Sequence, residues 1–156
     1  KGKGMGFSIT GTIIAAVMLL PNIIFLFFPP QNVRAEETGA GRFFTIMEYI
    51  GQVALIALLV ISHDSFDGRP FDVWAVLMAI CIAVYYGLWL RYFLTGRQAR
   101  LLYRPLLALP VPMAVFPVFA FAFSGVWGNS LFLLAASAVF ALGHIPTCLR
   151  KAKLYK

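Results

Sequence analysis

Long apolar runs separated by short polar connections fill the chain. Five of these runs are long enough for a helix to cross a hydrocarbon core of about 30 Å, which takes about 20 residues. They cover roughly residues 7–28, 43–61, 72–94, 105–124 and 130–148. The connections between them carry Gly, Pro, Asn and Asp residues, which are typical of turns. The pattern predicts an all-α integral membrane bundle of five transmembrane helices.

The fourth run, LLALPVPMAVFPVFAFAF, is apolar throughout but contains Pro110, Pro112 and Pro117. A proline inside a helix leaves the carbonyl four residues earlier without its usual donor. In lipid such a carbonyl must be paired with a neighbouring group or with water in a cavity. Two interpretations stay open: a kink that serves packing alone, or a bend that opens a pocket in the bundle.

Composition supports a membrane environment for these helices. Of the 156 residues, 61% are hydrophobic and only 12% are charged, which is about half the share in a typical soluble domain. The net charge is +7, but the basic residues lie beside apolar runs, an arrangement that favours membrane orientation over nucleic-acid binding. We interpret residues 1–4, KGKG, as a remnant of cloning and residues 5–156 as a single transmembrane domain.

Lysine and arginine are unequally distributed between the two sides of the predicted bundle. The N-terminal side has three, Lys1, Lys3 and Arg69. The opposite side has ten: Arg34, Arg42, Arg91, Arg97, Arg100, Arg104, Arg150, Lys151, Lys153 and Lys156. The positive-inside rule therefore predicts an external N-terminus and a cytoplasmic C-terminus. We expect the basic tail, RKAKLYK, to bind anionic lipid headgroups at the cytoplasmic face.

Polar side chains within the runs are the candidate ligand-binding residues. They are Asn22, Glu48, Gln52, Tyr85, Tyr86, Arg91 and His144. A charged side chain at membrane depth costs about 2.5–3.5 kcal/mol on insertion scales, and for that reason it usually indicates function. Glu48 is the only acidic residue well inside a run, and Gln52 follows one turn later on the same helix face.

Three of these residues share a predicted depth. Glu48 lies six residues after Arg42, Asn22 six before Phe28 and His144 six before Arg150. Each is therefore about 9 Å inside the cytoplasmic boundary, at roughly 1.5 Å per residue. If Glu48 is ionised, its natural partner is Arg91 or His144. Two interpretations remain open for the cluster: hydrogen bonds that only stiffen the bundle, and a site for a ligand or ion.

Other chemistry finds little support in the sequence. The loop SHDSFDGRPFD contains His63, Asp64 and Asp67, which could bind a divalent metal, but a solvated turn is the interpretation we favour. The sequence has no Walker motif, no HExxH, no GxSxG and no redox pair of cysteines. We therefore expect no metal and no cofactor.

Several segments resemble small, uncharacterised multi-span membrane proteins of Gram-positive bacteria. These segments are MLLPNIIFLFFPP, FFTIMEYIGQ, YYGLWLRYF, RPLLALPVPMAVFPV and LGHIP, and the resemblance extends over nearly the whole chain. It implies a multi-pass protein of the bacterial cytoplasmic membrane. No activity is established for those proteins, so the resemblance implies no chemistry and assigns no functional residue.

Three functions stay open at this point. The first is binding or translocation of a small solute, ion or proton in an inner-leaflet pocket, with Glu48 bearing the charge and His144 as its titrating neighbour. The second is a non-catalytic partner or regulatory subunit, which would grip another protein or a second copy through stripes of small residues. The third is a membrane-embedded enzyme acting on a lipid or isoprenoid, in which Glu48 and His144 form an acid–base pair.

Overall fold

The computed structural model describes residues 6–34 and 40–155, and the expected cloning remnant at residues 1–4 lies outside them. The described residues form helices and contain no strand, which confirms the all-α prediction. In chain order the helices are α1 (Ile9–Phe27), α2 (Arg42–Ile61), α3 (His63–Phe66), α4 (Val73–Leu94), α5 (Ala99–Tyr103), α6 (Pro112–Trp127) and α7 (Leu131–Lys153).

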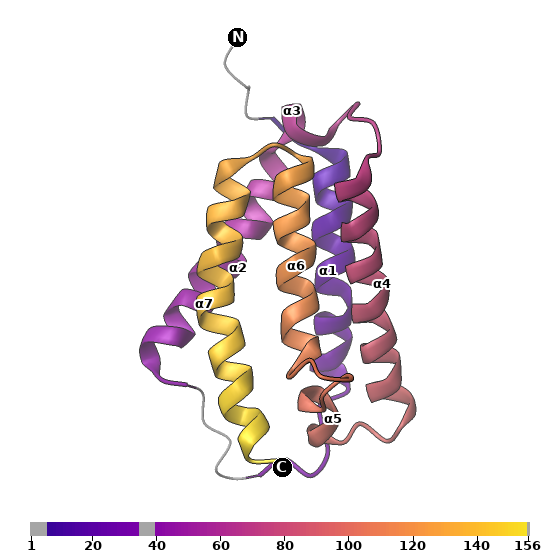
Figure 1. Cartoon of the computed structure of the whole chain (residues 1–156), viewed down its shortest axis with the longest axis vertical. Helices are drawn as coiled ribbons and strands as arrows, with labels where there is room; N and C mark the ends of the chain where they lie inside the picture. The colour runs from indigo at the N-terminus through magenta and orange to yellow at the C-terminus, as the bar shows by residue number, and fades with distance from the viewer. Residues whose placement is uncertain (1–5, 35–39, 156) are drawn as a thin grey trace.

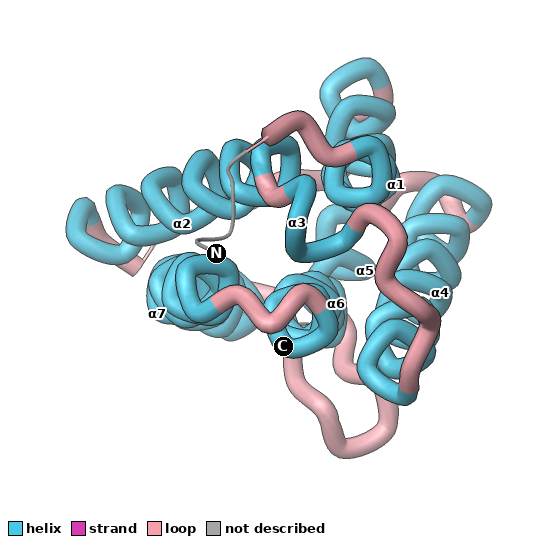
Figure 2. The backbone as a smooth tube through the Cα atoms, turned by 90° about the horizontal axis from the view of Figure 1, so that it is seen from above, coloured by secondary structure: helices cyan, strands magenta, loops and turns pink. Residues whose placement is uncertain are grey.

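The long helices run side by side along the longest axis of the molecule (Figure 1). The short helix α3 and the start of α1 lie at one end, here called the α3 end, while α5 and the last turn of α7 lie at the opposite α5 end. Seen from above, α4, α6 and α7 follow one another as neighbours, and α2 lies along α7 (Figure 2). Toward the α5 end, α2 leans away from α1 (Figures 1 and 2).

Four helices, α1, α2, α4 and α7, are long and apolar enough to cross a membrane, and α6 is a shorter apolar helix of 16 residues. Large apolar side chains also cover the outside of the bundle, as Leu26 and Phe27, both 76% exposed, illustrate. A soluble protein rarely exposes an apolar surface of this extent, whereas lipid solvates it without cost. Length and surface together indicate a membrane protein.

The fourth apolar run differs from its predicted form. We expected a helix over 105–124 with three internal prolines, but α6 begins only at Pro112, and only Pro117 lies inside it. Proline disfavours the helical conformation in the residue before it, so the Pro-Val-Pro sequence interrupts the helix. Val111 takes a left-handed conformation with φ 44°, and Pro112 occupies the first helical position, where its missing N–H is not needed.

The residues before α6 form a compact turn in place of the predicted helix. Leu106 and Leu109 exchange backbone hydrogen bonds of 3.1 and 3.0 Å, so the carbonyl of Leu106, which we expected to lack a donor, is paired. The remaining runs fold within a few residues of their predicted limits, except that α7 continues to Lys153. Pro110 and Pro112 therefore shape a turn at the α5 end and set the start of α6.

Candidate functional site

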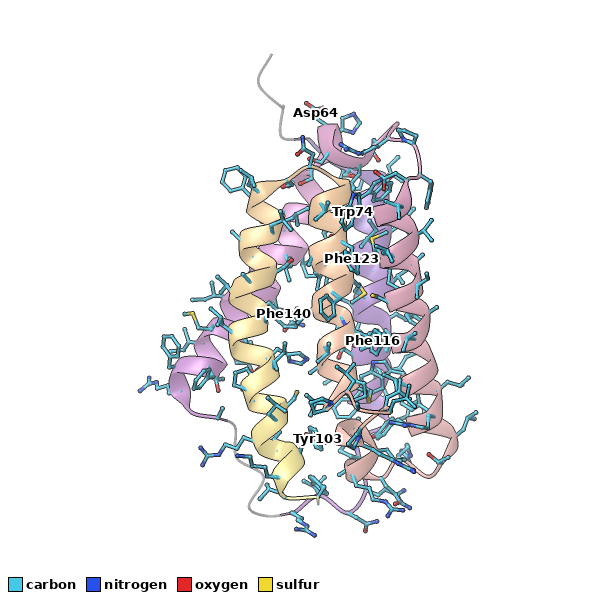
Figure 3. All side chains as sticks on the ribbon, viewed as in Figure 1. Asp64, Trp74, Tyr103, Phe116, Phe123 and Phe140 are labelled. Atoms are coloured by element: carbon cyan, nitrogen blue, oxygen red, sulfur yellow. The ribbon has the colours of Figure 1, made fainter. Side chains whose placement is uncertain are left out.

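A carboxylate and an imidazole meet between α2 and α7. Glu48 Oε1 lies 2.7 Å from Nδ1 of His144, and both side chains are mostly buried, with exposed fractions of 24% and 21%. The His144 ring also stacks on the Phe140 ring, with centroids 4.7 Å apart. In Figure 3, Phe140 extends from α7 toward the space beside α6. The imidazole is thus held by a hydrogen bond on its edge and by an aromatic ring on its face.

Two glycines create the close approach that brings Glu48 to His144. A Cβ on Gly143 would lie 2.2 Å from the Glu48 backbone nitrogen, and a Cβ on Gly51 would lie 2.4 Å from the Phe140 nitrogen. Neither position leaves room for a side chain, so the backbones of α2 and α7 touch. Small residues permit such approaches between membrane helices. Each glycine lies within three residues of an ionisable group.

Asn22 and Tyr85 add a second polar pair from α1 and α4. Asn22 Nδ2 donates hydrogen bonds to the Tyr85 hydroxyl at 3.1 Å and to the Met18 carbonyl at 3.2 Å. Tyr85 is buried, with an exposed fraction of 4%. The structure therefore gathers four polar side chains from four helices, and we call Asn22, Glu48, Tyr85 and His144 the polar quartet.

The polar quartet borders two cavities. The larger has a volume of about 400 Å³ and extends toward the α5 end, where Thr45, Tyr103 and Lys151 line it. The smaller, of about 150 Å³, extends toward the α3 end, where Gln52 and Phe121 are among its lining residues. All four members of the quartet line both cavities. The polar quartet thus lies where the two cavities meet.

Two predicted site residues lie elsewhere. Tyr86 donates its hydroxyl to the Val17 carbonyl at 2.6 Å. Pro21 explains this contact, because it has no N–H to offer the carbonyl four residues before it. Arg91 donates to the Leu101 carbonyl at 3.3 Å, so of the two partners considered for Glu48 the structure selects His144. Gln52 lines only the smaller of the two cavities.

Trp89 also lines the site, although it is not among the predicted ligand-binding residues. Its side chain lines the larger cavity and is 7% exposed. Among the described residues its indole Nε1 has no partner in hydrogen-bond geometry. The sequence could have predicted this position, because Trp89 follows Tyr85 by one helical turn and so lies on the same face of α4.

The polar loop after α2 has a structural role at the α3 end. The Asp67 carboxylate accepts hydrogen bonds from the backbone N–H groups of Ile9 and Thr10, at 3.2 and 3.0 Å, and caps the start of α1. The Thr10 hydrogen bond is the main reason that the pKa of Asp67 falls to about 2, with the 2.7 Å contact to His63 contributing. Within the described residues no three His, Cys, Asp or Glu side chains are placed to hold a metal ion.

No family model, curated protein or solved structure matches this chain.

Proposed function

We propose that this protein is a solute-binding membrane protein whose larger cavity takes a small cationic solute or exchanges a proton at Glu48. The observation that carries the proposal is the polar quartet, which four separate helices direct to the junction of two cavities. Hydrogen bonding within the bundle needs no ionisable group, since Asn or Gln would serve. A Glu–His pair that lines a cavity is better explained by a charged group that is offered to a ligand.

The chemistry of the cavity fits such a ligand. Its volume of about 400 Å³ lies within the usual range of small-molecule sites, roughly 300–1,000 Å³. Glu48 supplies a carboxyl group that can contact a cation, and His144, whose Nδ1 lies 2.7 Å from Glu48 Oε1, holds that carboxyl group in position. The Trp89 N–H and the Tyr85 hydroxyl provide polar contacts within the same wall.

The proposed placement is a bacterial cytoplasmic membrane, with five crossings, an external α3 end and a cytoplasmic α5 end. In this arrangement α6 makes the fourth crossing together with the turn at 105–111. Non-helical backbone is tolerated at membrane depth where it lines a cavity, and Pro105, Pro110 and Val111 do line one at the α5 end. The ten basic residues counted on the α5 side support a cytoplasmic location for that end.

A membrane-embedded enzyme is the second candidate. A neighbouring cavity at the α5 end is lined by Arg100, Arg104 and Lys153, and Tyr103 lines both this cavity and the larger one. An amphiphile whose anionic group is held there would come near Glu48 and His144. There the pair would act as general acid and base. The partner-subunit hypothesis has less support, because a subunit that only binds another protein does not account for the two cavities beside the polar quartet.

Ligand-induced thermal stabilisation tests the proposal. Purified protein in neutral detergent is heated with a panel of small organic cations, each at 5–10 mM (about the range in which weak ligands give a measurable shift). We expect at least one cation to raise the Tm of the wild type and of the control Gln52→Ala, and to leave the Tm of Glu48→Gln unchanged. Equal stabilisation of Glu48→Gln, or no stabilisation of the wild type by any cation, would contradict the proposal.

A further inference from the structure

A third cavity, of about 440 Å³, lies at the α5 end outside the polar quartet. The turn at 105–111, α5 and the last turns of α7 form its walls. Three cationic side chains, Arg100, Arg104 and Lys153, line it, and no carboxylate does. Tyr103, which Figure 3 shows on α5 at this end of the molecule, separates it from the larger cavity of the quartet.

The positive charge of this cavity is not balanced by the acidic residues that the structure describes. Glu48 contacts His144, and the described aspartates, Asp64, Asp67 and Asp72, lie in or beside the connection between α2 and α4 at the α3 end. Asp64 is labelled at that end in Figure 3. Arg100 uses its Nε to donate a 2.7 Å hydrogen bond to Gln98, and this contact leaves its terminal nitrogens for another acceptor. The cavity is therefore suited to an anion.

The remaining walls of the cavity are apolar and aromatic. Pro110, Val111 and Leu149 contribute aliphatic surface, and the stacked rings of Tyr103 and Tyr155 lie with centroids 5.4 Å apart. The occupant thus meets cations on one side and hydrocarbon on another. Because the cavity lies at the ends of helices that are suited to cross a membrane, this combination matches the boundary between lipid headgroups and acyl chains.

We propose that the third cavity binds the phosphate group of an anionic phospholipid, with Arg100, Arg104 and Lys153 contacting the phosphate and Leu149 and Val111 contacting the glycerol and first acyl carbons. Arginine matches phosphate geometry because its planar guanidinium can donate two parallel hydrogen bonds. Lipid is also the molecule that surrounds this end of the bundle at the highest concentration. The proposal does not depend on the function assigned to Glu48 and His144.

Lipid binding in neutral detergent tests this site. Native mass spectrometry measures adducts with three probes: dioctanoyl phosphatidylglycerol, dioctanoylglycerol without phosphate, and inorganic phosphate. We expect the wild type to bind the phospholipid and not the diacylglycerol. Arg104→Gln combined with Lys153→Gln should weaken phospholipid binding at least about tenfold, which corresponds to about 1.4 kcal/mol.

The control has the same change in net charge. Arg97→Gln combined with Arg150→Gln alters two cations that do not line the cavity, and Arg97 packs over the Phe28 ring. We expect this double variant to keep its affinity within about twofold of the wild type (about 0.4 kcal/mol). Equal losses in both double variants, or equal binding of dioctanoylglycerol, would overturn the proposal.

Two further observations complete the experiment. Displacement of the phospholipid by millimolar inorganic phosphate would keep the phosphate site but overturn its assignment to a lipid, whereas no displacement would support the lipid as the source. Arg104, Arg150 and Lys153 are exposed and Arg97 is half-buried, so none of these substitutions alters the core and we expect both double variants to fold. If one is not recovered, Lys153→Gln alone is compared with Arg150→Gln alone, and the same ranking of affinities is required.

Discussion

At the residue scale, a single proline explains why two adjacent tyrosines have different roles. Tyr85 lines both cavities of the quartet, whereas Tyr86 pairs with the Val17 carbonyl that Pro21 leaves without a donor. The sequence shows two neighbouring polar rings in an apolar run and offers no means of separating them. Their roles depend on α1, which lies beside α4 only in the folded protein (Figure 2).

A double-mutant cycle tests this assignment of Tyr86. Tyr86→Phe should lower the free energy of unfolding by about 1–3 kcal/mol, because it leaves the Val17 carbonyl unpaired within the bundle. In a Pro21→Ala background the new N–H of residue 21 can pair with that carbonyl, so the same substitution should cost much less. Chemical unfolding in mixed micelles measures both values, and equal costs in the two backgrounds would refute the assignment.

At the element scale, apolar length alone locates α1, α2, α4 and α7, since each fills most of its run. Apolar length does not locate the start of α6, because an apolar segment can form either a helix or a turn that is compatible with lipid. The start of α6 follows instead from the rule that proline disfavours a helical conformation in the residue before it. This rule applies to Leu109 and Val111, which precede Pro110 and Pro112. The close contact of α2 with α7 could not be predicted, because Gly51 and Gly143 are informative only once the two helices are paired.

The contact between α2 and α7 leads to a prediction that links packing to the site. Gly143→Ala would place a Cβ 2.2 Å from the Glu48 nitrogen and 2.5 Å from the Phe44 carbonyl, so the helices must separate. We expect a loss of about 1–3 kcal/mol in unfolding free energy, the usual range for overpacking. The cation-induced rise in Tm should be lost as well.

Gly87→Ala is the matched control for Gly143→Ala. Gly87 also lies within a long helix, but a Cβ there meets no atom within 4 Å. We expect this variant to be as stable as the wild type or slightly more stable, and to keep its response to cations. If Gly143→Ala behaves in the same way, the close approach of α2 and α7 does not position the Glu48–His144 pair.

At the scale of the whole molecule, charge and polarity are separated along the bundle axis. The described aspartates lie at the α3 end, the cations of the third cavity lie at the α5 end, and the polar quartet lies between them. Counting residues from the ends of the runs indicated that Asn22, Glu48 and His144 share a depth, and the structure brings all three to the same cavities. A pocket at this depth was one of the interpretations left open by the sequence, but the walls of the two cavities could not be predicted, because they depend on how α2 leans from α1.

The proposed function requires the larger cavity to be open at the α5 end and to present the Glu48 carboxyl group to a cation. Cys148 lines this cavity and Cys81 does not, so a Cys81→Ala protein carries a single native probe. The measurement is the rate at which membrane-impermeant thiosulfonates label Cys148 in vesicles that expose the α5 end. We predict labelling by a cationic and an anionic reagent, with the cation-to-anion rate ratio falling severalfold in Glu48→Gln. A Cys148 that only membrane-permeant reagents label, or a ratio that Glu48→Gln leaves unchanged, would contradict the account.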